Sequence, residues 1–174
     1  MSEQVSENFI SVSERLKRFK PNSGRRTVKH YPTGIKKLDQ MLGGGLYAGL
    51  MFLGARPGMG KSTFALQIAS EIAAAGSPVL FYSLEMPSVR MEAKILNRAI
   101  HMRYPNSSLT ADWFLREENN TGKQKEWKLV EKVGEEISGS FDRMYIKERK
   151  KLSVSGRDIV QDVEMFMNEK KENR

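Results

Sequence analysis

Short apolar runs alternate along the chain with longer stretches in which apolar residues recur three or four positions apart. The short runs predict strands over residues 50–54, 79–84 and 143–147. The run at 79–84 is apolar at nearly every position, as expected of a parallel strand that is buried on both faces. A sheet of this kind needs helices to connect its strands and to cover its faces.

The longer stretches have the spacing of amphipathic helices, over residues 61–75, 87–101 and 123–137. A last helix is expected to start at a cap formed by Ser153 or Ser155. A strand, a helix and a second strand are thus complete by residue 84, and a right-handed crossover is the default. The predicted fold class is α/β, with helices in layers on a parallel sheet.

An earlier amphipathic stretch, residues 9–20, carries Phe9, Val12, Leu16 and Phe19 on one helical stripe. Its opposite face is charged and mostly basic. A helix of this length is marginal by itself in water, so its apolar stripe needs a partner. That partner is either the domain of the same chain or a neighbouring subunit.

Charge separates the chain into two parts. Residues 1–31 are expected to form a disordered start followed by the basic helix, and residues 32–174 the folded domain. From Arg15 to Lys37 there are nine Lys or Arg residues and no acidic residue, within a net charge of +8. Such a block favours contact with nucleic acid or another polyanion, and its alternative is a solvated arm.

Several classes of protein are disfavoured by what the sequence lacks. Without cysteine there are no disulfides or thiolate metal sites, which fits a reducing cytoplasm. No apolar run approaches the length of a membrane span, and the first residues do not have the pattern of a secretory signal. His30 and His101 are isolated, so a metal site built from protein ligands alone is not expected.

The main chemical signal is a glycine-rich turn between the first expected strand and the helix at 61–75. It reads Gly54-Ala55-Arg56-Pro57-Gly58-Met59-Gly60-Lys61-Ser62-Thr63. Strand, glycine-rich turn, Gly-Lys-Ser and helix together are the layout of a phosphate-binding P-loop. Ala55 stands where the strict motif has glycine, a substitution that the smallest side chain allows.

Each residue type in this loop suits a phosphate ligand. Gly58 and Gly60 allow the backbone to turn its N–H groups into one concavity, and the helix directs its positive end there. Lys61 is expected to reach the β- and γ-phosphates, and Ser62 to offer its hydroxyl to Mg²⁺. The predicted nucleotide-binding residues are Ala55, Arg56, Pro57, Gly58, Met59, Gly60, Lys61, Ser62 and Thr63.

Glu85 follows the strand expected at 79–84, in Ser83-Leu84-Glu85-Met86. The carboxyl end of a strand in an open α/β sheet is the edge where ligands bind. Glu85 is therefore placed either as the base that orients an attacking water or as an exposed loop carboxylate, and the residues alone leave both open.

Four segments together resemble the RecA-like motor domain of DnaB-type replicative helicases. They are Pro32-Thr33-Gly34-Ile35 with Leu38-Asp39, Gly43-Gly44-Gly45-Leu46, Gly54 to Ser62, and Ser83-Leu84-Glu85-Met86. The loop from Ala55 to Lys61 and the Ser-Leu-Glu-Met strand end are the most specific. The similarity continues more weakly to the last helix.

The resemblance implies a three-layer, RecA-like ATPase that binds ATP and Mg²⁺, with Lys61 and Glu85 as catalytic residues. It implies single-stranded DNA as a partner. Residues 9–20 lie where the family has a linker helix that docks on the adjacent subunit of a ring, which implies self-association.

The chain also departs from the family pattern. An apolar run ending in Asp, the Walker B strand, does not follow residue 84, and by the resemblance this strand, the DNA-binding loops and the arginine finger lie beyond residue 174. An incomplete sheet is therefore expected. The alternatives are a non-catalytic nucleotide-binding or regulatory module and a small P-loop kinase. The kinase is disfavoured because about fifty residues precede the loop, whereas such kinases begin near it.

Overall fold

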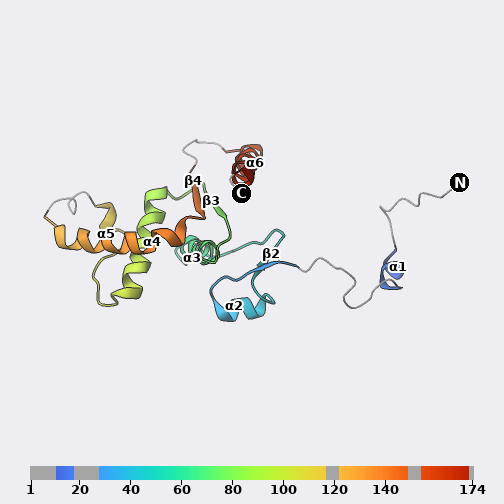
Figure 1. Cartoon of the computed structure of the whole chain (residues 1–174), viewed down its shortest axis with the longest axis horizontal. Coiled ribbons are helices and arrows are strands. Elements are labelled where there is room, and N and C mark those ends of the chain that lie inside the picture. Colours follow the sequence, from blue (N-terminus) through green and yellow to red (C-terminus); the bar gives the residue numbers. More distant parts are fainter. Residues whose placement is uncertain (1–10, 18–27, 117–121, 149–153, 173–174) are drawn as a thin grey trace.

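The computed structural model describes residues 11–17, 28–116, 122–148 and 154–172 (Figure 1). Its elements in chain order are α1 (Val12–Lys17), β1 (His30–Tyr31), α2 (Lys36–Met41), β2 (Leu46–Tyr47), α3 (Lys61–Ala74), β3 (Val79–Ser83), α4 (Ser88–Arg103), η1 (Trp113–Leu115), α5 (Gln124–Ser138), η3 (Gly139–Phe141), β4 (Met144–Glu148) and α6 (Gly156–Glu172). The predicted α/β class is thus confirmed in its coarse form, with a small parallel sheet.

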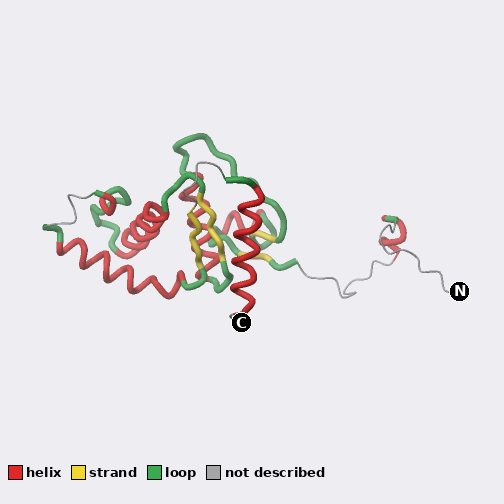
Figure 2. Tube along the Cα trace, turned by 90° about the horizontal axis from the view of Figure 1, so that it is seen from above, coloured by secondary structure: helices red, strands yellow, loops and turns green. Residues whose placement is uncertain are grey.

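β3 and β4 pair in parallel over their whole length, from Val79 opposite Met144 to Ser83 opposite Glu148. These strands confirm the predictions at 79–84 and 143–147 to within one residue. Because side chains alternate across a strand, the register gives the sheet two distinct faces. Figure 2 shows the strand pair with helices on both sides.

One face of the sheet meets α6 and the other meets α3 and α4. On the α6 side, Tyr145 packs edge-on against Phe166, with 5.0 Å between ring centroids, and Lys170 Nζ lies 4.1 Å above the Tyr145 ring. On the other side, α3 reaches the sheet where the Ser70 hydroxyl lies 3.9 Å from the Met144 sulfur. The helices therefore form two layers around the strand pair.

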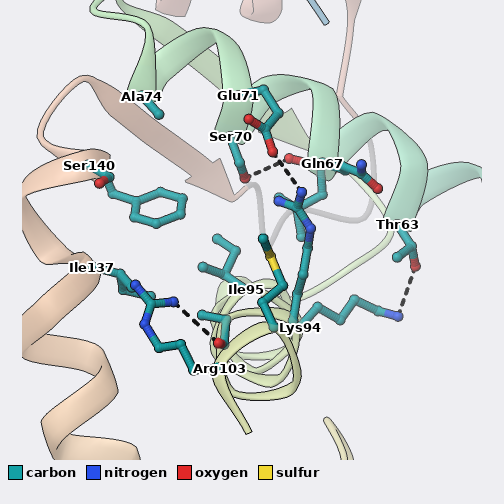
Figure 3. A pocket seen from close by; sticks show the side chains of 15 residues that line it. Thr63, Gln67, Ser70, Glu71, Ala74, Lys94, Ile95, Arg103, Ile137 and Ser140 are labelled. Atoms are coloured by element: carbon teal, nitrogen blue, oxygen red, sulfur yellow. Dashed lines mark hydrogen bonds and ion pairs between the residues drawn. The ribbon is translucent and has the colours of Figure 1, made fainter. Parts of the chain in front are cut away.

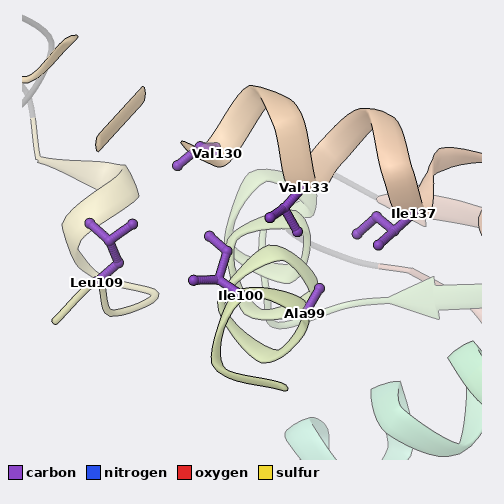
Figure 4. Close-up of a cluster of buried hydrophobic side chains, with 6 residues drawn as sticks. All are labelled: Ala99, Ile100, Leu109, Val130, Val133 and Ile137. Atoms are coloured by element: carbon purple, nitrogen blue, oxygen red, sulfur yellow. The ribbon is translucent and has the colours of Figure 1, made fainter. Parts of the chain in front are cut away.

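The largest buried cluster lies between α4 and α5 rather than against the sheet (Figure 4). Its members are Ala99, Ile100, Leu109, Val130, Val133 and Ile137. α5 has the predicted inward face, and Trp127 stacks at its edge against Trp113 with 5.1 Å between ring centroids. The short helix predicted around Trp113 is present as η1 and closes this cluster.

The strand predicted at 50–54 is wrong. Residues 50–54 have no regular secondary structure, and Leu50 and Phe52 are 82% and 90% exposed. A strand forms only when its backbone groups find a partner, and within the described residues the sheet offers this run none. β1 and β2, which pair antiparallel, were not predicted from the sequence.

β1 and β2 are held close to a buried turn. Thr33, fully buried, donates from both its N–H and its hydroxyl to the Asp39 carboxylate, each at 2.7 Å. Thr33 therefore joins the turn to α2 through Asp39, whereas the residue at the N-cap position of α2 is Ile35. At Gly45 (φ +125°) an added Cβ would lie 2.3 Å from the Tyr31 carbonyl oxygen, so the close approach of the chain before β2 to the end of β1 requires glycine.

Several apolar helix positions are exposed. Val89, in the first turn of α4, precedes the part of the helix that packs on α5, and Met102 lies in its last turn. Val163 and Met167 of α6 are also exposed, because a two-stranded sheet covers little of this helix. Met91 of α4, in contrast, is buried.

The ends of the helices were predicted more closely. Gly76 follows α3 with φ +91°, the left-handed conformation expected there. Ser155 caps α6 through its hydroxyl, which donates to the Asp158 carboxylate at 2.8 Å and accepts from the Asp158 N–H at 3.3 Å. Ser153, the alternative cap, lies outside the described residues.

At the N-terminus, α1 occupies the middle of the predicted helix at 9–20. Val12 and Leu16 of the predicted apolar stripe are exposed. Phe9 and Phe19 lie outside the described residues, as do residues 1–8. The partner of this stripe stays a prediction.

We expect Ile100→Ala to lower the free energy of unfolding by about 2–5 kcal/mol, because it opens a cavity among fully enclosed side chains. Urea denaturation followed by circular dichroism measures the change. Val89→Ala, on the same helix but 54% exposed, is the matched control and should shift stability by less than about 1 kcal/mol. Equal losses for the two variants would contradict this description of the core.

Candidate phosphate-binding site

The glycine-rich loop has a backbone shape that ordinary side chains disfavour. Gly58 (φ +78°) and Gly60 (φ +85°) both adopt the left-handed region, and a short turn is closed by the Met59 N–H, which donates to the Arg56 carbonyl at 3.2 Å. A Cβ added at either glycine would meet nothing within 4 Å. The glycines are therefore needed for conformation, and the space in front of the loop is open.

α3 begins directly after this loop. Its first intrahelical hydrogen bond runs from the Phe64 N–H to the Gly60 carbonyl, at 2.9 Å. The N–H groups of Lys61, Ser62 and Thr63 precede this bond and have no carbonyl one turn earlier in the helix. They stand at the positive end of the helix dipole, where an anion is stabilised.

Lys61, Ser62 and Glu85 line one cleft, with a volume of about 360 Å³. Lys61 and Ser62 come from the first turn of α3, and Glu85 from the loop after β3. Leu53 and Phe81 also line this cleft and form an apolar part of its wall. The structure therefore brings the Glu85 carboxylate into one cleft with the Lys61 ammonium group and the Ser62 hydroxyl, although Glu85 lies more than twenty positions after them in the sequence.

The turn that carries Glu85 is fixed by Ser83. This buried hydroxyl donates to the Met86 carbonyl at 2.6 Å and accepts from the Met86 N–H at 3.1 Å. Both bonds close the chain around Leu84 and Glu85, so the Glu85 backbone is held while its side chain stays exposed. Ser83 was part of the quoted motif, but its bonding role was not predicted.

Three contacts attach neighbouring elements to this edge of the sheet. Tyr82, which lines the cleft, donates from its hydroxyl to the Asp162 carboxylate of α6 at 2.8 Å. Lys147 lies 3.7 Å from the same carboxylate. At the start of α4, the Ser88 N–H donates to the Glu148 carboxylate at 2.9 Å, so the last residue of β4 caps α4.

Not all predicted loop residues line this cleft. Ala55, Arg56, Pro57 and the exposed Met59 belong to the loop but are not among the residues of the cleft wall. The side chain of Thr63 faces away from the cleft, toward α4, where its Oγ1 accepts a hydrogen bond from Lys94 Nζ at 3.0 Å (Figure 3).

The cations Arg90, Lys94 and Arg98 lie on one face of α4. Arg98 forms an ion pair with Glu71 of α3 at 2.6 Å, and Lys94 contacts Thr63. Arg90 pairs with the exposed Asp112 at 3.5 Å. Lys94 and Arg98 therefore point toward α3, a neighbour that the sequence does not reveal.

Thr63, Lys94 and Arg98 also line a second hollow, of about 170 Å³, between α3 and α4. Figure 3 shows the side chains of Thr63 and Lys94 directed into the space between these helices. The first turn of α3 therefore has one side turned to the Glu85 cleft and the other to Lys94.

The oxygen ligands of the site suit a hard divalent cation. The Ser62 hydroxyl and the Glu85 carboxylate line the same cleft, and Mg²⁺ prefers such oxygens together with water and phosphate. In the part of the chain that the structure describes, no group of three or more His, Cys, Asp or Glu residues is arranged to hold a metal ion. None of the described helices is long and apolar enough to cross a membrane.

Comparison with known proteins gives one family match over most of the chain. Residues 31–171 match the model of the DnaB-like helicase C terminal domain. No solved structure was found that matches the chain.

Curated relatives match over shorter segments. The chain is 48% identical over 59 residues to the DNA repair protein RadA of Mycolicibacterium smegmatis, which covers 33% of this chain and 13% of that protein. It is 34% identical over 93 residues to the replicative DNA helicase DnaB of Haemophilus influenzae, covering 53% and 19%, and 32% identical over 100 residues to that of Pasteurella multocida, covering 55% and 21%. The chain thus matches about a fifth or less of the length of these relatives.

We expect Gly60→Ala to reduce the stabilisation of the protein by inorganic pyrophosphate, because a side chain with a Cβ disfavours φ +85° by about 1–2 kcal/mol and moves the loop. Thermal denaturation with and without pyrophosphate measures it. Gly139→Ala is the control, since Gly139 has an ordinary right-handed φ of −59° and open space around it. Undiminished stabilisation in the Gly60 variant would show that this loop does not hold the anion.

Proposed function

Since the chain belongs to the family of DnaB-like helicase C-terminal domains, we propose that it is the ATP-binding core of a DnaB-like hexameric replicative DNA helicase. In the complete protein this core would couple ATP hydrolysis to DNA unwinding. The observation that carries the proposal is the common cleft of Lys61, Ser62 and Glu85 at the N-terminus of α3.

The residues of the loop would hold the phosphates of ATP. Residues 55–60 wrap the phosphates with backbone N–H groups, and Lys61 neutralises the β- and γ-phosphates. Ser62 would hold Mg²⁺, which when bound neutralises charge on the β- and γ-phosphates. Thr63 closes the set with its N–H and hydroxyl.

Glu85 is the proposed general base. Its carboxylate lines the cleft beside Lys61, on a turn held by the two hydrogen bonds of Ser83. From there it would orient a water toward the γ-phosphate and accept its proton.

Partners of the complete protein follow from the family rather than from a contact within the described residues. We propose that residues 9–20 dock on a neighbouring subunit, since Val12 and Leu16 are exposed on α1. Single-stranded DNA is the proposed polymer substrate, and the basic segment from Arg15 to Lys37 favours such a polyanion. A cytoplasmic location is part of the same proposal.

A non-catalytic nucleotide-binding role is the second candidate, and one observation favours it. Glu85 is the single acidic residue that lines the cleft in the described part of the chain. Family members that hydrolyse ATP also use a second carboxylate on the metal side, as the sequence comparison with the Walker B pattern implied. This role predicts binding without turnover.

We expect Lys61→Ala to lower the affinity for a fluorescent ATP analogue by at least about 100-fold, because a charge-assisted contact with two phosphates is lost in the cleft. Titration followed by fluorescence anisotropy measures it. Lys128→Ala removes an exposed lysine of α5 and should bind like the wild type. An unchanged affinity of the Lys61 variant would refute the proposed function.

We expect Glu85→Gln to bind ATP with an affinity within about threefold of the wild type and to lose at least about 100-fold in phosphate release, because the amide cannot accept the proton of the attacking water. Phosphate release with and without single-stranded DNA distinguishes the candidates. DNA-stimulated release supports the helicase core, binding without release supports the non-catalytic role, and ADP formation without phosphate release, seen only with a small acceptor, indicates a kinase.

A further inference from the structure

We propose that Lys94 of α4 is a positioning residue for the phosphates, acting through Thr63 at the first turn of α3. The inference rests on the proposed nucleotide site and extends it to a side chain outside the glycine-rich loop. Lys94 lies more than thirty residues after Thr63, and the contact between Lys94 Nζ and Thr63 Oγ1, at 3.0 Å, brings them together (Figure 3).

The chemistry of this pair sets the direction of its hydrogen bond. An ammonium group has three donors and no acceptor, so the Thr63 oxygen must accept. The hydroxyl proton of Thr63 is then left to donate elsewhere. Ser70, on the same helix, instead donates its proton back to the Leu66 carbonyl at 2.7 Å. Lys94 therefore keeps Thr63 as a donor at the helix end that attracts anions.

The charge of Lys94 is also left without a compensating carboxylate. Its neighbours in the same row each have one, since Arg90 pairs with Asp112 and Arg98 with Glu71. Among the residues that the structure describes, no carboxylate lies within ion-pair distance of Lys94 Nζ, whose contact is with a neutral hydroxyl. A full positive charge thus stands beside the N-terminus of α3, where it adds to the helix dipole.

A purely structural role would be to hold α3 against α4. Arg98 already does this two turns further along α3, through its 2.6 Å ion pair with Glu71. If the Lys94–Thr63 contact served only to hold α3 against α4, a carboxylate would be expected in place of Thr63 as well. The unpaired charge and the freed hydroxyl proton favour an anion as the third member of the Lys94–Thr63 pair.

The first turn of α3 has two different sides, and these indicate how the phosphates of a bound nucleotide would be oriented. Lys61 and Ser62 face the cleft of Glu85, where the terminal phosphate is attacked, and Thr63 and Lys94 face the hollow toward α4. The phosphates nearer the nucleoside therefore lie on the Lys94 side. Lys94 should contribute equally to ADP and ATP, because the phosphates that it serves are common to both.

The test is a fluorescent-nucleotide titration with ADP and ATP analogues. We expect Lys94→Met to weaken both by the same factor, about three- to tenfold, the net effect of one solvent-exposed hydrogen bond. Lys94→Arg should restore most of the affinity. Arg90→Met, which removes a cation of the same row that lines neither cavity, should bind like the wild type, and urea denaturation of all variants monitors folding.

A double-mutant cycle makes the result specific to the pair. Thr63→Val should lose a similar factor, and the Lys94→Met/Thr63→Val double variant should lose little more than either single change, because both remove one contact. Wild-type affinity in Lys94→Met, additive losses, or an equal loss in Arg90→Met would overturn the inference. If the wild type itself binds no nucleotide, the proposed function fails together with this inference. If the wild type binds nucleotide and Lys94→Met binds equally well, only the inference about Lys94 fails.

Discussion

The parallel pairing of β3 with β4 is the constraint on which the other elements depend. Its register places Tyr82 and Lys147 on the face that meets Asp162 of α6, and Met144 on the face that meets α3. The same register brings Glu148 beside Ser83, so the residue that caps α4 and the residue that holds the Glu85 turn lie at one edge. A shift by one residue would exchange the two faces and separate these contacts.

Local periodicity was sufficient to predict much of the fold. α3, α4 and α5 were found to within about two residues, because apolar spacing and end signals such as Gly76 are encoded nearby in the chain. The run at 50–54 failed because strand formation depends on a partner that apolar character does not supply. The β1–β2 pair was missed since two-residue strands have no readable alternation.

The residues of the candidate site likewise divide into those that could be predicted from the sequence and those that could not. Lys61, Ser62 and Glu85 were predicted because a motif and a strand end carry their positions in the sequence, and the structure places them in one cleft. Lys94 was not, because a cation on a helix face looks solvated until the neighbouring helix is known. The bonds of Ser83 were likewise hidden, since a short hydroxyl reveals its partners only in three dimensions. The roles of these residues in nucleotide chemistry stay predictions.

The hydrogen bond between the Ser88 N–H and the Glu148 carboxylate joins residues sixty positions apart, and this separation bears on the order in which the domain folds. Contacts between residues far apart in the sequence tend to form later than local ones, so α4 and α5 can pack on each other before β4 pairs with β3. Until then the first turn of α4 lacks its cap, and the turn that carries Glu85 is anchored on one side only. We therefore expect the helical pair to fold early, and the sheet edge that carries Glu85 to order among the last parts of the domain.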